Sequence, residues 1–312
     1  MSTFLLRRAI AGVLSLLGAT FIVFGITQAS EDPLLLYAKP GGYGITEEQK
    51  DALRAKLGID KPIPVQYVLW VGRATRGDLG NSILDELPVT TKISQRIGIT
   101  LKLGVLAWLV ATGIGVPLGV LAAVKRGSAW DYVGRSFALF GQAVPNFWLG
   151  IIMIMIFALW LGWLPSAGKG EGFISWRHMV MPVIVLGTAT AAGYLRITRS
   201  AMLEILDSEF VKLARAKGVT NNWVVWKHAL RNALIPPLTV SAVLMASFIT
   251  GSVITESVFA IPGLGRLAID AVNQKDFPVI SGVTLLFVTV WVVMNFVTDI
   301  LYVVIDPRIR LS

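Results

Sequence analysis

Residues 103–124, LGVLAWLVATGIGVPLGVLAAV, contain no charge and are bounded by Lys102 and Lys125. As an α-helix rising 1.5 Å per residue, this stretch would be about 33 Å long, which is enough to cross a lipid bilayer. A soluble domain would interrupt such a run with charges at helix or strand period. The stretch therefore predicts a membrane-spanning helix.

The rest of the chain repeats this pattern, because the 312 residues are 54% hydrophobic and only 15% charged. Apolar blocks recur between charged residues, which excludes an ordinary cytosolic enzyme. The first block is too long for a cleaved signal peptide, so we expect it to be retained. The absence of cysteine excludes disulfides and thiolate metal sites. We predict an all-α polytopic membrane protein with six spans, at residues 9–30, 103–124, 136–168, 178–195, 232–255 and 277–298.

Basic residues lie mostly on one side of this topology, and short cytoplasmic loops are the ones enriched in Lys and Arg. The long connection 31–102 is exempt, since long segments translocate largely regardless of charge. Opposite short connections contain only Lys169, Arg177, Arg266 and Lys275. We expect both termini to be cytoplasmic, and the net charge of +9 then gives no reason to expect nucleic-acid binding. The basic side includes Arg7, Arg8, Lys125, Arg126, Arg135, the Lys and Arg residues between positions 196 and 231, Arg308 and Arg310.

The region between the first two spans is predicted to be structured. Residues 46–58 have a capping box, a narrow apolar stripe and a terminal Gly58, as a helix would. Residues 62–64, Pro-Ile-Pro, then interrupt the chain. Apolar and basic residues alternate over residues 89–97 in a way that fits a helix lying along the membrane surface. This region is a candidate docking surface.

The composition changes near Gly98, where closely spaced apolar blocks begin. We therefore predict an N-terminal part, residues 1–98, that contains the first span and an extracytoplasmic region. Residues 99–306 would form the main transmembrane domain, and residues 307–312 a cytoplasmic tail.

The cytoplasmic connection at residues 200–234 is too long and too patterned to be a simple turn. Ser208 can cap a first helix that ends at Gly218, and Asn222 can cap a second. The apolar face left on such short helices needs a cover, which could be the protein's own bundle, anionic lipid or the groove of a soluble subunit. The residues alone leave these three open. The apolar faces are Phe210, Leu213 and Ala214 in the first helix and Trp223, Trp226 and Leu230 in the second, with Lys212, Arg215 and Lys217 exposed.

The chain resembles the permeases of binding-protein-dependent ABC importers, in the dipeptide, oligopeptide and nickel branch. The resemblance covers nearly the whole chain, with the motifs in the same order. They are LGIDKP (57–62), GDLG (77–80), LRITRS (195–200), ARAKG (214–218), HALRNALIP (228–236), TE (255–256), PGLG (262–265) and DPRIR (306–310).

The resemblance implies the type I importer permease fold and a bacterial plasma-membrane location. It implies that residues 209–220 form a coupling helix for a separate ATPase. It also implies partners: a second homologous permease, two cytoplasmic ATPase subunits that hold Mg-ATP, and an extracytoplasmic solute-binding protein. This chain would hold no cofactor, and it lacks a G-x-x-x-x-G-K-[ST] loop. The implied coupling residues are Glu209, Phe210, Leu213, Ala214, Arg215, Ala216, Lys217, Gly218 and Val219.

Catalytic and metal sites are not expected. The two histidines, His178 and His228, fall on opposite sides of the membrane in the predicted topology, which excludes a shared metal or acid–base pair. Asp299 lies in the last span, where an acid is a functional candidate, although it also lies close enough to the cytoplasm to be a structural acid. Glu256 could face the translocation path or the docked receptor, or could be a solvated loop residue.

Alternative functions would use these acids differently. An ion-coupled transporter or channel would be centred on Asp299 and would need no ATPase. An intramembrane hydrolase would need a histidine beside a serine nucleophile, and neither histidine of this chain lies convincingly in a span beside such a serine. We expect an importer subunit, not an enzyme. Its cargo stays open among dipeptides, longer peptides, glutathione-like compounds, nickel chelates and opines.

Overall fold

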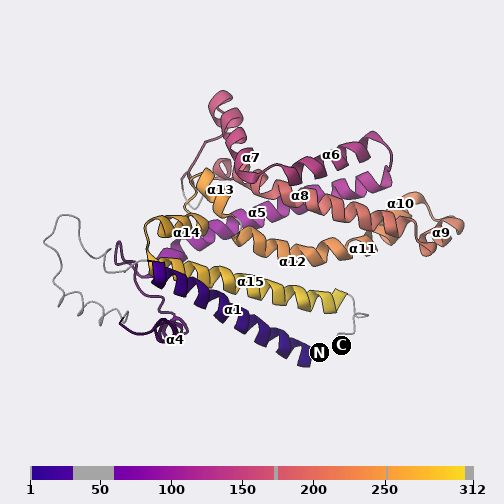
Figure 1. Cartoon of the computed structure of the whole chain (residues 1–312). Coiled ribbons are helices and arrows are strands. Elements are labelled where there is room, and N and C mark those ends of the chain that lie inside the picture. The colour runs from indigo at the N-terminus through magenta and orange to yellow at the C-terminus, as the bar shows by residue number, and fades with distance from the viewer. Residues whose placement is uncertain (1, 31–59, 172–174, 251, 306–312) are drawn as a thin grey trace. The chain divides into compact units, whose positions relative to one another are not determined.

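The computed structural model describes residues 2–30, 60–171, 175–250 and 252–305. Within these ranges the chain is helical, and a single bridge between Asn81 and Pro88 is the only β-type pairing. The all-α prediction is confirmed, whereas the predicted helix at residues 46–58 and the tail at residues 307–312 lie outside the described residues. In chain order (Figure 1) the helices are α1 (Ser2–Ser30), α4 (Ile63–Ala74), α5 (Val89–Val124), α6 (Ala129–Ala143), α7 (Asn146–Met153), η1 (Ile154–Trp160), α8 (Trp176–Leu206), α9 (Glu209–Ala216), α10 (Asn221–Trp223), η2 (Val224–Ala229), α11 (Leu230–Ala233), α12 (Ile235–Thr250), α13 (Val253–Val258), α14 (Leu264–Asn273) and α15 (Phe277–Ile305).

Four of the described helices are long and apolar enough to cross a membrane, and a bent pair raises the number to five. The predicted count of six is therefore not confirmed. Helix α12, where the fifth span was expected, has 16 residues, about 24 Å at 1.5 Å per residue. The four are Leu6–Ala29, Val89–Val124, Trp176–Leu206 and Phe277–Ile300.

The third predicted span, residues 136–168, is bent instead of straight. Ala129–Ala143 and Asn146–Trp160 meet at 103°. Pro145 lies at the break, with extended backbone angles, and precedes the first residue of α7. A proline has no N–H to continue the helical ladder and disfavours helical geometry in the residue before it, so the chain turns there.

The sequence predicted a separate surface helix over residues 89–97, and this prediction is wrong. These residues are the first turns of α5, which continues without a break to Val124. Val89 and Ile93 are buried in this part of the helix. The alternation of apolar and basic residues reflects one packed face of a long helix.

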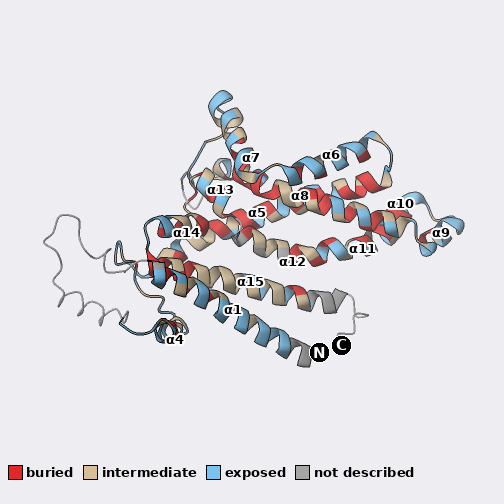
Figure 2. Ribbon diagram, in the orientation of Figure 1, coloured by how far each residue is buried: buried red, intermediate tan, exposed pale blue. Residues whose placement is uncertain are grey.

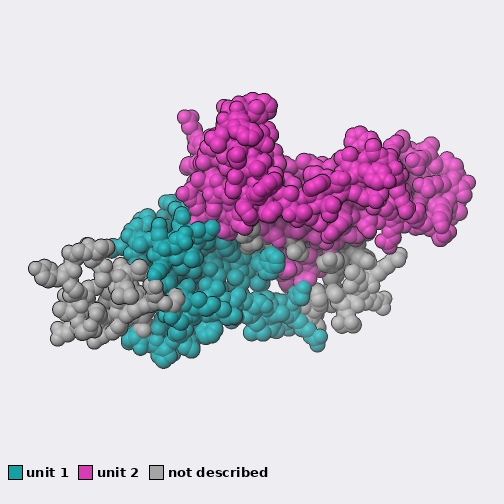
Figure 3. Space-filling model, turned by 45° about the horizontal axis from the view of Figure 1, so that its top comes forward, with its two compact units in different colours: residues 1–98, 267–292 teal, residues 99–266, 293–312 magenta. Residues whose placement is uncertain are grey.

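The chain divides into two compact units, shown in different colours in Figure 3. The first comprises Met1–Gly98 and Leu267–Val292, and the second comprises Ile99–Arg266 and Val293–Ser312. The boundary at Gly98 coincides with the composition change in the sequence. Residues 267–292 join the first unit, although they follow the predicted boundary by many residues.

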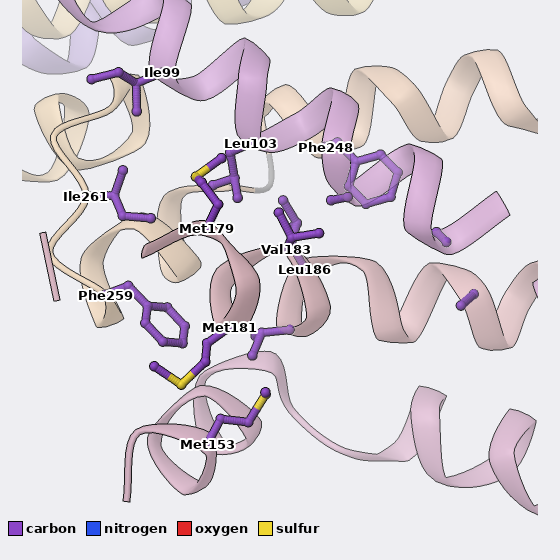
Figure 4. Packing of buried hydrophobic residues seen from close by; sticks show 14 of the residues in the cluster. Ile99, Leu103, Met153, Met179, Met181, Val183, Leu186, Phe248, Phe259 and Ile261 are labelled. Atoms are coloured by element: carbon purple, nitrogen blue, oxygen red, sulfur yellow. The ribbon is translucent and has the colours of Figure 1, made fainter. Parts of the chain in front are cut away.

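The core of the second unit is apolar and rich in methionine. Met153, Met179 and Met181 pack with Phe259 and Ile261, side chains that come from α7, α8 and the segment after α13 (Figure 4). Flexible thioethers fill irregular gaps between helices that cross at different angles. This core places α13 against α7 and α8.

Small residues let α5 and α8 approach closely. A Cβ on Gly115 would collide with the carbonyl oxygen of Ala191, and one on Gly119 would lie 2.7 Å from Cβ of Thr198. Neither neighbour is the movable end of a long side chain, so only glycine fits at these two positions. Glycines four apart thus allow backbone contact between these helices.

In the first unit, the loop before α5 is held by a polar cluster. The buried carboxylate of Asp276 accepts hydrogen bonds from the Ser82 hydroxyl and the Ile83 N–H. Lys92 donates to Ser82 and, at 2.7 Å, to Asp85. The hydrogen bond from Lys92 lowers the pKa of the Asp85 carboxyl below its ordinary value, and partial desolvation opposes this shift.

Candidate coupling site

Helix α9 has clear start and stop signals. Ser208 is extended at the N-cap, Glu209 lies in the first turn and Arg215 in the last, as the helix dipole favours. Ser208 is thus the N-cap residue, as predicted, but its hydroxyl donates to the carbonyl of Ile205 and makes no capping bond. Gly218 has φ +78°, in the left-handed region, and ends the helix as predicted.

The end of α9 is a Schellman motif. The Gly218 N–H bonds to the Arg215 carbonyl at 2.9 Å, and the Val219 N–H bonds to the Ala214 carbonyl at 3.2 Å. These two bonds satisfy carbonyls that the helix end would otherwise leave without a partner. The motif sets the direction in which the chain enters α10.

One side of α9 is attached to the rest of the second unit through Val211, its only buried residue. Helix α9 packs against α8 and η2. The ends of α5 and α8 meet η2 and α11 in a small apolar cluster beneath this segment. The cluster consists of Val120, Ala123, Ala201, Met202, Val225, Ala229 and Ala233.

The other side of α9 is exposed and apolar. Phe210 is 44% exposed and Leu213 57% exposed, and Ala214 beside them is half-buried. Lys212, Arg215 and Lys217 are exposed as predicted. Figure 2 shows α9 almost entirely in the colour of exposed residues. The second unit thus presents two large apolar side chains on a helix that it also anchors. The same segment carries three exposed cations, one of which, Lys212, is paired with Glu209 at 2.8 Å.

The second helix differs from the prediction. Thr220 is the N-cap residue, whereas the predicted cap, Asn222, lies inside α10. The helix changes to a π-helix over Val224–Ala229, which shifts side chains relative to a regular helix. Trp223 and Trp226 are nonetheless exposed, and the Lys227 ammonium lies 4.5 Å from the centre of the Trp223 ring.

A buried carboxylate in α6 joins that helix to the last third of α8, which leads into α9. Asp131, with 0% of its side chain exposed, accepts bonds of 2.8 and 3.1 Å from Arg199 in α8. Arg135 in α6 donates a further bond of 2.8 Å, and the Gly127 N–H one of 3.0 Å. The carboxylate therefore fixes the α5–α6 connection to α8, close to the end of α8 at Leu206.

Glu256 is fully buried in the second unit, so it is not a solvated loop residue. Its carboxylate accepts bonds from Thr100 at 2.7 Å, Ser252 at 2.9 Å and the Arg266 N–H at 3.1 Å. Gly263 lies so close that a Cβ there would overlap the carboxylate. These contacts hold the PGLG turn against α13 and α5, an arrangement that suits a structural acid.

Asp299 is half-buried in α15 and makes an interaction within the protein. It lies in a different helix from both Glu256 and the residues of α9. Among the residues that the structure describes, no group of three or more His, Cys, Asp or Glu could hold a metal ion.

Sequence reasoning did not identify Asp131, Arg199, Val211 or Thr100 as site residues. Arg199 stands inside the LRITRS motif, but its partner is 68 positions earlier. Asp131 could have been noticed as an acid within a basic connection, next to a predicted span. Thr100 carried no signal, because its role depends on a residue 156 positions away.

Comparison with known proteins gives the family. Residues 115–311 match the family described as binding-protein-dependent transport system inner membrane component, and residues 1–104 match the N-terminal domain of such components. The chain is 40% identical to the oligopeptide transport system permease protein AppB of Bacillus subtilis (strain 168), over 99% of this chain and 100% of that one. It is 37% identical to the dipeptide transport system permease protein DppB of Escherichia coli (strain K12), over 99% of each.

Solved structures support the fold. The inward-facing MetNI methionine ABC transporter matches with a TM-score of 0.55 at 20% identity, over 69% of this chain and 96% of that chain. An amino acid ABC transporter matches with a TM-score of 0.50 at 21% identity, over 70% and 95%. At this identity the likeness concerns the fold alone. The family match and the full-length relatives together show that the chain belongs to the inner-membrane components of binding-protein-dependent transport systems, and is a translocation component, not an enzyme.

Proposed function

We propose that this chain is the permease subunit of an ATP-driven ABC importer of dipeptides, oligopeptides or related small solutes. The family supports the importer, and the names of the full-length relatives support peptides as cargo. An ion-coupled transporter centred on Asp299 is not favoured, because the family is that of binding-protein-dependent transport systems. The partners would be a second homologous permease, two ATPase subunits and an extracytoplasmic solute-binding protein.

Both termini would be cytoplasmic in this proposal. Its support is the distribution of Lys and Arg among short connections, and residues 200–234 would then be cytoplasmic as well. Mg-ATP would be bound and hydrolysed by the partner ATPases, and its hydrolysis would supply the free energy for transport. This chain would supply the path and the contact through which that work is delivered.

The observation that carries the proposal is the exposed apolar side of an anchored helix. Leu213 projects from α9 on the side opposite the fully buried Val211, and the exposed Phe210 lies beside Leu213. An amphipathic helix laid into an apolar groove is a recurring mode of protein recognition, and surrounding cations would favour an acidic rim on the partner. Movement of the ATPases would then be transmitted to α8 through Val211 and the contacts that α9 makes with α8 and η2.

The test is Leu213→Glu in the assembled transporter, with Leu213→Met as the matched control. Because Leu213 is more than half exposed, neither change should unfold the chain. We expect Leu213→Glu to lose ATPase binding in co-purification and to lose substrate-stimulated ATP hydrolysis and uptake, while Leu213→Met keeps all three. Wild-type ATPase binding and uptake in Leu213→Glu would overturn the coupling assignment.

A further inference from the structure

Helix α4 of the first unit packs one side against α1. Tyr67 and Trp70 are buried there, and the Tyr67 hydroxyl donates to the Leu17 carbonyl at 2.8 Å and bonds the Thr20 hydroxyl at 2.7 Å. The Tyr67 and Phe21 rings meet edge to face, with centroids 5.2 Å apart. These contacts fix both the position and the rotation of α4 on α1.

The opposite side of α4 is apolar and exposed. Val65, Val68, Leu69 and Gly72 follow one another at the i, i+3, i+4, i+7 spacing of a single helix face. Val68 is 67% exposed, and Val65 and Leu69 are each more than two-fifths exposed. Single exposed apolar residues are ordinary on protein surfaces, but a whole helix face without a polar residue requires a cover.

The position of α4 along α1 indicates what the cover is. Its partners Leu17, Thr20, Phe21 and Phe24 lie inside the candidate span Leu6–Ala29. Leu17 is at the middle of this span, and the other three lie in the half that ends at Ala29. At 1.5 Å per residue, these partners lie roughly 7 to 18 Å below that end of the span, with the two phenylalanines and Thr20 in roughly the upper 14 Å. An amphipathic helix at a membrane surface places its apolar face about 5 to 10 Å into the boundary of headgroups and acyl chains.

The ends of α4 fit the same location. Its 12 residues reach only about 18 Å, too short to cross the bilayer. Lys61 precedes the helix, and Arg73 and Arg76 stand at and beyond its last turn, all exposed. Charges at both ends of a short apolar helix can reach the headgroup layer while the middle stays in hydrocarbon.

We propose that α4 is an interfacial helix whose Val65, Val68 and Leu69 face is covered by acyl chains of the leaflet at the Ala29 end of α1. Phospholipid is thereby a direct partner of the extramembrane region that follows the first span. The inference rests on α1 crossing the membrane and does not depend on the cargo or on coupling through α9. A helix held in this way would keep the chain before α5 close to the bilayer surface.

Spin labelling tests this directly, because the chain contains no cysteine. Single variants Val68→Cys and Leu69→Cys would be labelled in the transporter assembled with partner subunits whose cysteines have been replaced, in vesicles of phosphatidylethanolamine and phosphatidylglycerol. Collision rates with oxygen and with a water-soluble nickel complex are then compared. Leu14→Cys in the exposed part of α1 is the lipid reference, and Asp78→Cys after α4 is the water reference.

We expect the oxygen-to-nickel ratio at positions 68 and 69 to exceed that at position 78 several-fold and to approach that at position 14. A ratio equal to that at position 78 would show water on this face and overturn the proposal. Low collision rates with both reagents would show a protein partner on it and would equally overturn the proposal. Loss of transport in any variant leaves these readings valid, since the ratio is measured on the folded assembly.

Discussion

Arg199 in α8 and Asp131 in α6 form a two-pronged ion pair, in which the guanidinium donates bonds of 2.8 and 3.1 Å to the two carboxylate oxygens. The pair joins helices that also run along each other in Figure 1. Because Asp131 is fully buried and also accepts the Gly127 N–H, it fixes three segments at once. Those segments are the α5–α6 connection, α6 and the last third of α8.

Replacing Asp131 by Ala should destabilise the second unit strongly. The change leaves Arg199, which is 20% exposed, without its main partner, and removing one member of a buried pair costs on the order of 3 kcal/mol. We expect a lower Tm of the detergent-solubilised transporter. The control is Arg135→Ala, since Arg135 is half exposed and should cost no more than about 1 kcal/mol. Equal losses of Tm in both variants would contradict the conclusion that the ion pair of Asp131 with Arg199 contributes more stability than its ion pair with Arg135.

Gly115→Ala and Gly113→Ala should have opposite effects on stability. A methyl group at position 115 would collide with the α8 backbone, whereas nothing lies within 4 Å of Cβ at position 113. Gly113→Ala should be neutral or stabilising by up to about 1 kcal/mol, because alanine is the better helix former. Tm and the yield of assembled transporter measure both. A Gly115→Ala variant as stable as wild type would show that α5 and α8 do not touch as described.

Gly218→Ala should weaken coupling more than it weakens folding. Gly218 and Gly127 both have φ +78°, and a Cβ added at either would meet nothing within 4 Å. Alanine should therefore cost each position only the backbone strain of the left-handed region, roughly 1 to 2 kcal/mol, with similar losses in Tm. Only Gly218→Ala, at the end of α9, should lower the uptake obtained per ATP hydrolysed. An equal loss of that ratio in Gly127→Ala would remove the argument for α9.

Gly263→Ala should disrupt the buried Glu256 site. Because no space exists between position 263 and the carboxylate, the methyl group must displace one or the other. Glu256→Gln keeps the shape but turns one acceptor into a donor that faces N–H and O–H donors, at a cost of about 1 to 3 kcal/mol. Reduced Tm in both, with Gly263→Ala lower, is the expected result. A Glu256→Gln variant with unchanged Tm but lost transport would instead favour a role in the path.

Stability should depend on Asp85 only at acidic pH. Its folded pKa is lowered, so its contribution is complete above the unfolded value near 4 and is lost as pH falls through the lower folded value. The difference in Tm between wild type and Asp85→Asn should thus be constant from about pH 7 to 5 and should narrow below about pH 4. A difference that already changes near pH 6 would point to another group.

Hydropathy predicted the helical class and most spans. A long uncharged run is stable in the bilayer, and there it must be helical so that its backbone N–H and C=O groups are paired. The same averaging hid the 103° bend, since a proline inside an apolar run does not lower its hydropathy. It also separated residues 89–97 from α5, because the charges there resembled the polar side of a surface helix. The burial of Val89 and Ile93 in the fold is what distinguishes the first turns of a long packed helix from a surface helix.

The site was predicted where local rules apply and missed where distant contacts decide. Gly218 was found because a left-handed residue after a short helix is a local requirement. The cap of the second helix was not, since Thr220, Asn221 and Asn222 are all good capping residues and only the fold selects among them. The π-helix after Trp223 has no composition signal of its own. Burial of Glu256 depends on Thr100, which the sequence places far away.

Helix α9 is held by one fully buried side chain, Val211, which can act as a pivot for the helix. A force applied at Leu213 acts on the side of the helix away from Val211, and so produces a torque on α9 as well as a push. Because α9 packs against α8, rotation of α9 about Val211 would press on the end of α8 while α9 stays helical.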